Sequence, residues 1–99
     1  MKSKEILKFS NPKKAFANAR KYLGRAVKIR LSSREDKKYM VYDPTKEIWV
    51  HFGQMGYEDF TKHKDSERRE DYLNRSANIE GDWKDNPYSA NNLARKILW

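Results

Sequence analysis

The chain has 99 residues, which is enough for one domain around one hydrophobic core. Apolar residues make up 37% and charged residues 36%, and the absence of cysteine excludes a disulfide scaffold, a thiolate zinc site and a cysteine nucleophile. No apolar run approaches the ~20 residues that span a bilayer, and the N-terminal residues lack the apolar region of a secretory signal. We therefore expect an intracellular protein with no membrane partner.

The net charge of +8 is unevenly distributed along the chain. Residues 1–40 carry 13 Lys/Arg and three Asp/Glu, whereas residues 41–99 carry nine Lys/Arg and eleven Asp/Glu. Charge concentrated in this way favours binding to a polyanion, while a merely solvated charged surface is the alternative interpretation.

The first ten residues are expected to form a flexible basic arm, followed by a single domain over residues 11–99. Asn11 and Pro12 are typical of a helix start, and Gly24 is typical of a helix end. The helix between them has a one-sided apolar pattern, and its polar side carries cations and no acid.

Alternating apolar and polar residues predict three strands, at 26–31, 38–42 and 47–52. The polar stretch 32–36 and the Asp-Pro sequence at 43–44 predict short turns between them. Short turns join neighbouring strands in opposite directions, so we expect a three-stranded antiparallel meander.

Residues 53–56 are a glycine-containing connector, after which the pattern becomes helical again. A short helix is predicted within 57–64, a second from 65 or 66 to about 78, and a last one that begins after Ser89. The C-terminal Leu98 and Trp99 are expected to dock against the core. The fold class is therefore α+β: an N-terminal helix, the meander, and two or three C-terminal helices.

The strongest functional candidate is a basic surface built from the first helix and the first strand. If these elements are neighbours, their cations form one continuous patch that tracks a phosphate backbone. The residues expected in this patch are Lys13, Lys14, Arg20, Lys21, Arg25, Lys28 and Arg30, with Lys2, Lys4 and Lys8 adding contacts from the arm.

Aromatic residues on the second and third strands suggest a second type of contact. Trp49 and His51 share one strand face, and together with Tyr42 they would form a stacking platform for unpaired bases. The alternative is that this face is packed inside the protein.

The sequence contains no recognisable catalytic or cofactor-binding motif, so we expect no enzyme, no cofactor and no metal. The four glycines are scattered and form no phosphate loop. A metal-dependent nuclease built from His51, His63 and the surrounding acids is an alternative, but acids at this density are more often a solvated helix face.

Three segments resemble a family of small basic proteins encoded by giant and other large double-stranded DNA viruses. They are residues 42–44 (YDP), 49–65 (WVHFGQMGYEDFTKHKD) and 83–99 (WKDNPYSANNLARKILW), within a resemblance that covers roughly residues 25–99. It implies a protein of the virion or virus factory, in the host cytoplasm or nucleus, that binds DNA with little sequence preference.

The function expected from sequence is therefore sequence-independent binding of nucleic acid, double-stranded DNA first, for genome compaction or protection. Alternatives are an RNA or single-strand binder and a protein–protein adaptor with a basic face.

Overall fold

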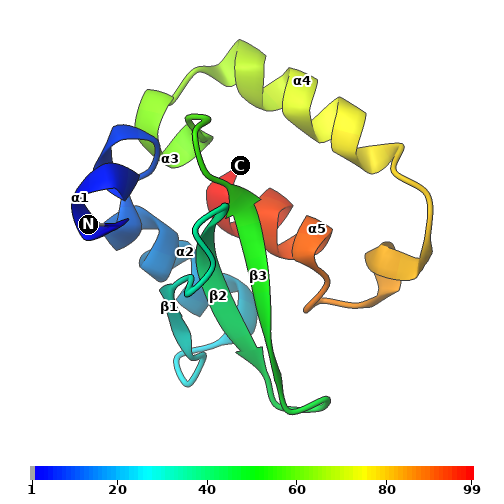
Figure 1. Ribbon diagram of the computed structural model, residues 1–99. Coiled ribbons are helices and arrows are strands. Elements are labelled where there is room, and N and C mark those ends of the chain that lie inside the picture. The colour runs from blue at the N-terminus through cyan, green and yellow to red at the C-terminus, as the bar shows by residue number, and fades with distance from the viewer. Residues whose placement is uncertain (1) are drawn as a thin grey trace.

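The computed structural model describes residues 2–99, and of Lys2 the backbone alone; Met1 of the expected arm lies outside the described residues. The elements in chain order are α1 (Lys2–Glu5), η1 (Ile6–Lys8), α2 (Pro12–Leu23), β1 (Ile29–Leu31), β2 (Lys37–Asp43), β3 (Ile48–Gln54), α3 (Phe60–His63), α4 (Ser66–Ala77), η2 (Asp82–Asp85), α5 (Ala90–Leu93) and η3 (Ala94–Leu98) (Figure 1). This arrangement confirms the α+β class expected from the sequence.

The three strands form one antiparallel sheet in the order β1-β2-β3. Two rows run across it, Leu31–Tyr39–Phe52 and Ile29–Val41–Val50. Tyr39, Val41 and Phe52 are fully buried, so these rows form the core face of the sheet. Residues that alternate with them point to the opposite face.

Helix α2 packs on the core face. The Asn11 side chain accepts a hydrogen bond from the Lys14 amide at 3.3 Å, as expected for a helix cap. Ala15 and Ala19 are fully buried, and the Phe16 ring meets the Tyr39 ring edge-on at 6.0 Å. α2 therefore reaches the sheet through the Phe16 ring, while its most extensive backbone approach is to η3.

The C-terminal helices complete the core beside α2. The Ser89 side chain caps α5, and Leu93, Ile97 and Leu98 are buried. The Asn18 side chain donates to the Ile97 carbonyl at 2.8 Å, which ties α2 to η3. The expected docking of the C-terminal residues is confirmed, since the Trp99 ring also stacks on Tyr72 at 4.4 Å.

The N-terminal segment differs from the expected flexible arm. Residues from Lys2 to Lys8 are helical, and Ile6 is fully buried in the core cluster. The Asp59 amide donates to the Phe9 carbonyl at 3.0 Å, which fixes the end of the segment. The apolar side chain of Ile6 has enough buried area to anchor a segment whose other residues are mostly polar.

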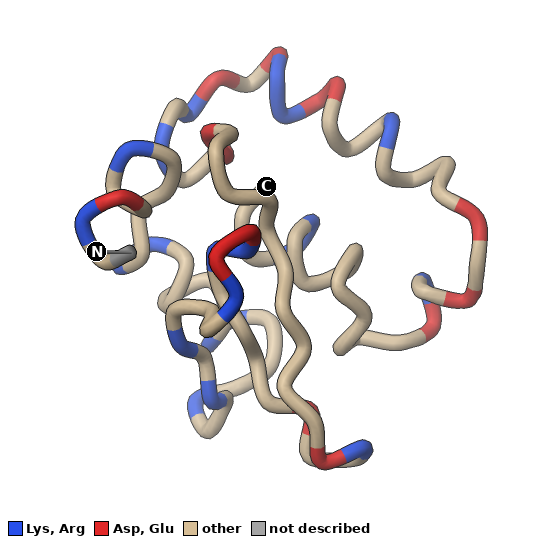
Figure 2. The backbone as a smooth tube through the Cα atoms, in the orientation of Figure 1, with Lys and Arg blue, Asp and Glu red and all other residues tan. Residues whose placement is uncertain are grey.

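Helix α4 begins at the Asp65 cap and runs along the edge of the molecule, apart from the sheet (Figure 1). Figure 2 shows acidic and basic residues alternating along it. Its contacts with the rest of the fold include the stacking of Tyr72 on Trp99 and the Leu73 carbonyl, which accepts from Arg95 at 2.7 Å.

Candidate functional site

The face of the sheet opposite the core carries cationic and aromatic side chains from all three strands. In the register of the sheet, Arg30 lies opposite Met40 and His51, and Tyr42 lies opposite Trp49. Lys28 joins this row because its carbonyl accepts the Tyr42 amide at 3.0 Å. We call this surface the outer sheet face, and its polar and aromatic residues are Lys28, Arg30, Tyr42, Trp49 and His51.

The cations on the outer sheet face lie over the aromatic rings. The Lys28 ammonium is 5.4 Å from the centre of the Tyr42 ring, and the Arg30 guanidinium is 5.1 Å from the Trp49 ring. The two rings meet edge-on at 5.4 Å. Attraction between a cation and the negative face of a ring holds each pair in place.

His51 is fixed at the edge of this surface. Its Nδ1 atom is 2.6 Å from the Ser32 hydroxyl, which also accepts the Arg34 amide at 3.0 Å. Ser32 is buried, so the turn after β1 holds the imidazole ring in one orientation.

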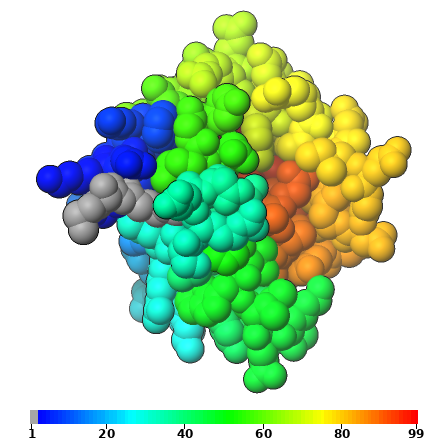
Figure 3. All heavy atoms as spheres, viewed as in Figure 1, coloured from blue at the N-terminus to red at the C-terminus, as the bar shows by residue number. Residues whose placement is uncertain are grey.

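The helices leave the outer sheet face open. α2, α5 and η3 contribute their buried residues to the cluster around Tyr39, Val41 and Phe52, on the core side. In Figure 3 the segment around the turn between β1 and β2 (teal) lies in the middle of this side, with residues of the β2–β3 hairpin (green) below it. Lys28 and Arg30 are exposed, and the remaining residues of the face are half-buried. Trp49 and His51 therefore lie outside the core cluster, half-buried at the surface.

The cations of the expected basic patch are divided between two sides of the molecule. α2 buries Ala15 and Ala19 in the core, so its exposed cations lie on the other sides of the helix; they are Lys13, Lys14, Arg20 and Lys21. Lys28 and Arg30 lie on the opposite side because they alternate with core residues of β1. Arg25 is exposed in the turn between the two sets. The single continuous patch predicted from sequence is thus replaced by two separate basic surfaces.

A buried polar network lies at the junction of the N-terminal segment, β2 and α3. The Lys38 ammonium is 3.1 Å from the Asp59 carboxylate and donates to the Tyr57 carbonyl at 2.6 Å. Asp59 also accepts from the Thr61 amide at 3.0 Å and from the Thr61 hydroxyl. The chain of hydroxyls continues through Ser10, 3.1 Å from the Thr61 hydroxyl, to Tyr39 at 2.7 Å. Sequence reasoning missed this network, and its one local signal is the position of Asp59 immediately before a helix.

The nuclease alternative finds no support in the arrangement of acids. Asp59 is fully engaged with Lys38 and Thr61, and within residues 2–99 no group of three or more His, Asp or Glu could hold a metal ion. His63 packs between Phe60 and Trp99, where burial and the nearby Arg68 lower the pKa of the imidazole. Nor does any helix in the described part of the chain have the length and apolar character to cross a bilayer.

The fold and the outer sheet face together define a small basic α+β domain with a cationic, aromatic sheet surface. A family model described as a family of unknown function (DUF5754) matches residues 27–76, and the chain belongs to this family. The match includes all three strands, and therefore the outer sheet face and both partners of the Lys38–Asp59 pair. No curated protein and no solved structure matches the chain.

Proposed function

We propose that this protein binds nucleic acid without sequence preference, and that single-stranded segments bind on the outer sheet face. The observation that carries the proposal is the presence of two neighbouring aromatic rings, each with a cation over it, on the sheet face opposite the core. Unpaired bases expose flat π-faces, which stack on aromatic rings and on the planar guanidinium of arginine.

The same residues explain why binding would not depend on sequence. Lys28 and Arg30 neutralise phosphates, which every nucleotide carries, and stacking accepts any base. The sheet would therefore contact the phosphate backbone of the nucleic acid and the flat faces of the bases. These contacts determine affinity, but they do not distinguish one base from another.

A second candidate is binding of double-stranded DNA through α2, in keeping with the resemblance to proteins of large DNA viruses. It is favoured by one observation: Lys13, Lys14, Arg20 and Lys21 are accessible, and none has a carboxylate within 4.0 Å in the described part of the chain. Cations without an acidic partner keep their full attraction for a phosphate backbone. In this form the protein would compact or protect a viral genome in the virion or virus factory.

The test is a titration of fluorescent oligothymidylate and of an unrelated duplex at several salt concentrations. We expect the single strand to bind more tightly, and Trp49→Ala to weaken that binding roughly tenfold, because one stacked base contributes ~1–3 kcal/mol. Tyr57→Ala is the matched control, since Tyr57 is the most exposed of the large hydrophobic residues and follows the sheet in the chain. Arg30→Gln should make the salt dependence shallower by about 0.7 units for a single strand.

Tighter binding of the duplex, unchanged in Trp49→Ala, would replace the sheet proposal with the α2 candidate. Absence of binding to either nucleic acid at low salt would contradict both, and would favour an acidic protein as the partner.

A further inference from the structure

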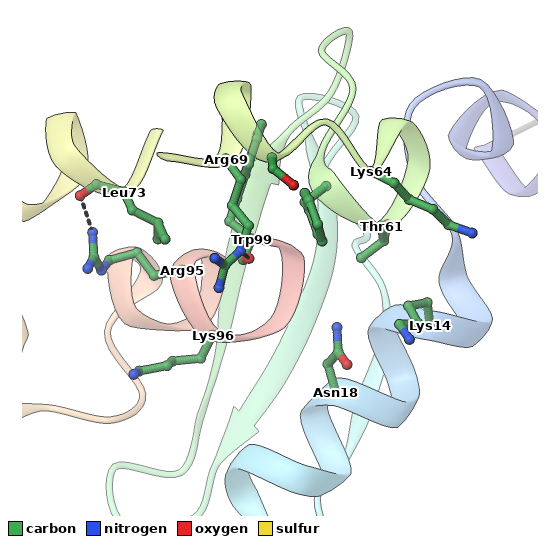
Figure 4. Close-up of a pocket in the computed structure, with 11 residues that line it drawn as sticks. Lys14, Asn18, Thr61, Lys64, Arg69, Leu73, Arg95, Lys96 and Trp99 are labelled. Atoms are coloured by element: carbon green, nitrogen blue, oxygen red, sulfur yellow. Dashed lines mark hydrogen bonds between the residues drawn. The ribbon is translucent and has the colours of Figure 1, made fainter. Parts of the chain in front are cut away.

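A groove on the helical side of the molecule gathers basic residues from three helices and from the residue that follows α3. It has a volume of about 710 Å³ and lies between α2, α3, the start of α4 and the C-terminal η3 (Figure 4). No strand residue is among those that line it. Its basic residues are Lys14, Lys64, Arg69, Arg95 and Lys96, and we call it the basic groove.

The basic groove has cations without acidic side chains beside them. Among the described residues that line it there is no Asp or Glu, and no Asp or Glu carboxylate in residues 2–99 lies within 4.0 Å of its five cations. One of the five, Arg69, donates to the backbone oxygen of Trp99, the last residue of the chain. Like charges brought together in this way repel one another, and a bound anion removes that repulsion. The chemistry of the groove therefore calls for a negatively charged ligand.

The two arginines are held in place, while the three lysines extend into solvent. The Arg69 guanidinium donates to the Trp99 carbonyl and lies 5.4 Å from the centre of the Phe60 ring. Arg95 donates to the Leu73 carbonyl at 2.7 Å and to the Ser76 hydroxyl. Lys14, Lys64 and Lys96 are exposed. Fixed arginines lose little side-chain entropy when a ligand binds, and the lysine stems can adjust to it.

The cations are spread across the groove. Figure 4 shows Arg95 and Lys96 on one side, Arg69 beside Trp99 in the middle, and Lys14 and Lys64 on the other side. A single compact phosphate is best held by cations that converge on one point. Cations spread in this way suit a ligand with successive negative charges, such as a phosphodiester chain.

We propose that the basic groove is a second nucleic-acid site, which holds the phosphodiester backbone of a segment other than the one on the outer sheet face. This inference rests on the proposed function, because the sheet face is the first of the two sites. The groove lies on the side of the helices, and the sheet core separates it from the outer face. Both sites can therefore be occupied at once, and one chain links two nucleic-acid segments without forming an oligomer.

The experiment counts how many short oligonucleotides one chain binds. An oligothymidylate of about six nucleotides, near the smallest site size of a sheet-based module, is titrated calorimetrically at low salt. We expect two per chain for the wild type. The groove variant Lys14→Gln, Lys64→Gln and Lys96→Gln should bind one, as should Trp49→Ala combined with Arg30→Gln.

A matched control removes the same charge elsewhere. Lys46→Gln, Arg75→Gln and Lys84→Gln also lowers the net charge by three, at exposed positions that do not line the groove, and should still bind two oligonucleotides. A sandwich assay adds a second readout: the wild type and the control should link an immobilised oligonucleotide to a labelled one, and the groove variant should not.

The possible failures are distinguishable. One oligonucleotide per wild-type chain, lost in the Trp49 and Arg30 variant and unaffected in the groove variant, overturns the groove site and leaves the proposed function intact. If the wild type binds one oligonucleotide and only the groove variant loses it, the proposed function on the sheet face is overturned, and the second site with it. The same conclusion follows if the wild type binds no oligonucleotide. A mononucleotide that blocks the groove as tightly as the oligonucleotide overturns the assignment to a phosphodiester chain.

Discussion

Lys38 and Asp59 are opposite charges buried together, with side chains only 3% and 1% exposed. Burial lowers the pKa of the Lys38 ammonium, and the Asp59 carboxylate opposes that effect. Removing two charges from water is costly, and mutual attraction offsets the cost only while both partners are present. Each of the two charges can therefore stay buried only because the other one is next to it.

Asp59→Asn is expected to destabilise the protein by about 3 kcal/mol or more, because it leaves the Lys38 cation buried without a counter-charge. Urea denaturation measures the loss. Adding Lys38→Met should recover part of the stability, since the pair is then neutral. Ordinary surface substitutions change the free energy of unfolding by no more than ~0.5 kcal/mol. A change that small in Asp59→Asn would contradict the role assigned to the pair.

The sequence predicts that Lys28 and Arg30 share one face of their strand and that Trp49 and His51 share one face of theirs, because strand alternation is a local property. That both pairs lie on the same side of the sheet follows from its register. The burial of Lys38 does not follow from the sequence. Its partner Asp59 is 21 residues away along the chain. From the local sequence alone, a lysine next to a tyrosine in a strand is expected to be exposed. The sequence shows which side chains share a face but not which distant side chains meet.

At the scale of the elements, β3 and η3 approach each other closely at Gly53. The backbone there has φ +81°, in the left-handed region that favours glycine. A Cβ atom at this position would lie 2.8 Å from Leu98 Cδ1 and 3.2 Å from Lys38 Cβ. The absence of a side chain lets the C-terminal helix rest on the end of the strand.

Gly53→Ala should destabilise the protein by more than Gly56→Ala does. Both glycines have positive φ, but a Cβ at Gly56 would meet nothing within 4 Å, so that variant carries the backbone strain alone. We expect ~1 kcal/mol for the strain and a further ~1–3 kcal/mol for the overpacking at Gly53. Thermal unfolding of the two variants gives the difference, and equal losses would mean that β3 and η3 are not tightly packed there.

Element ends are well predicted where a capping residue marks them. Asn11 and Ser89 cap helices in the structure as expected, and Asp65 is the cap where the sequence allowed residue 65 or 66, because each side chain binds amides of its own first turn. The N-terminal helical segment was missed, because its order comes from the burial of Ile6 by residues distant in sequence. Local patterns identify an element, whereas tertiary contacts decide whether a short segment stays ordered.

For the molecule as a whole, the core is assembled from parts of the chain that lie on both sides of the family match. Residues 27–76 supply Tyr39, Val41 and Phe52, but most of the core cluster comes from elsewhere: Ile6, Ala15, Ala19, Leu93, Ala94, Ile97 and Leu98. The matched region therefore exposes its core face when it is alone.

A fragment of residues 27–76 is expected to be unfolded, because a three-stranded sheet needs a packed apolar face for stability. Circular dichroism and the dispersion of amide resonances compare it with the full chain, which should unfold cooperatively. A fragment with dispersed resonances and its own unfolding transition would show that the matched region is an independent domain.

The division of charge is also a property of the whole molecule. The sequence locates the cations in the first two-fifths of the chain, and it cannot state that α2 and β1 direct them to opposite sides of the sheet core. The basic groove shows the same limit, since Lys14 meets Lys64, Arg69 and Lys96 from the other end of the chain. Which charged residues become neighbours on the surface depends on how the elements pack, and no single segment of the sequence determines that packing.

The three tryptophans lie in three different surroundings: Trp49 beneath Arg30, Trp83 beside Arg95, and Trp99 stacked on Tyr72 at the wall of the groove. Indole emission responds to its immediate environment, so replacing two of them by phenylalanine leaves one label-free optical probe. A chain that keeps only Trp49 reports occupancy of the sheet, and one that keeps only Trp99 reports occupancy of the helical side. The fold thus supplies its own pair of spectroscopic markers.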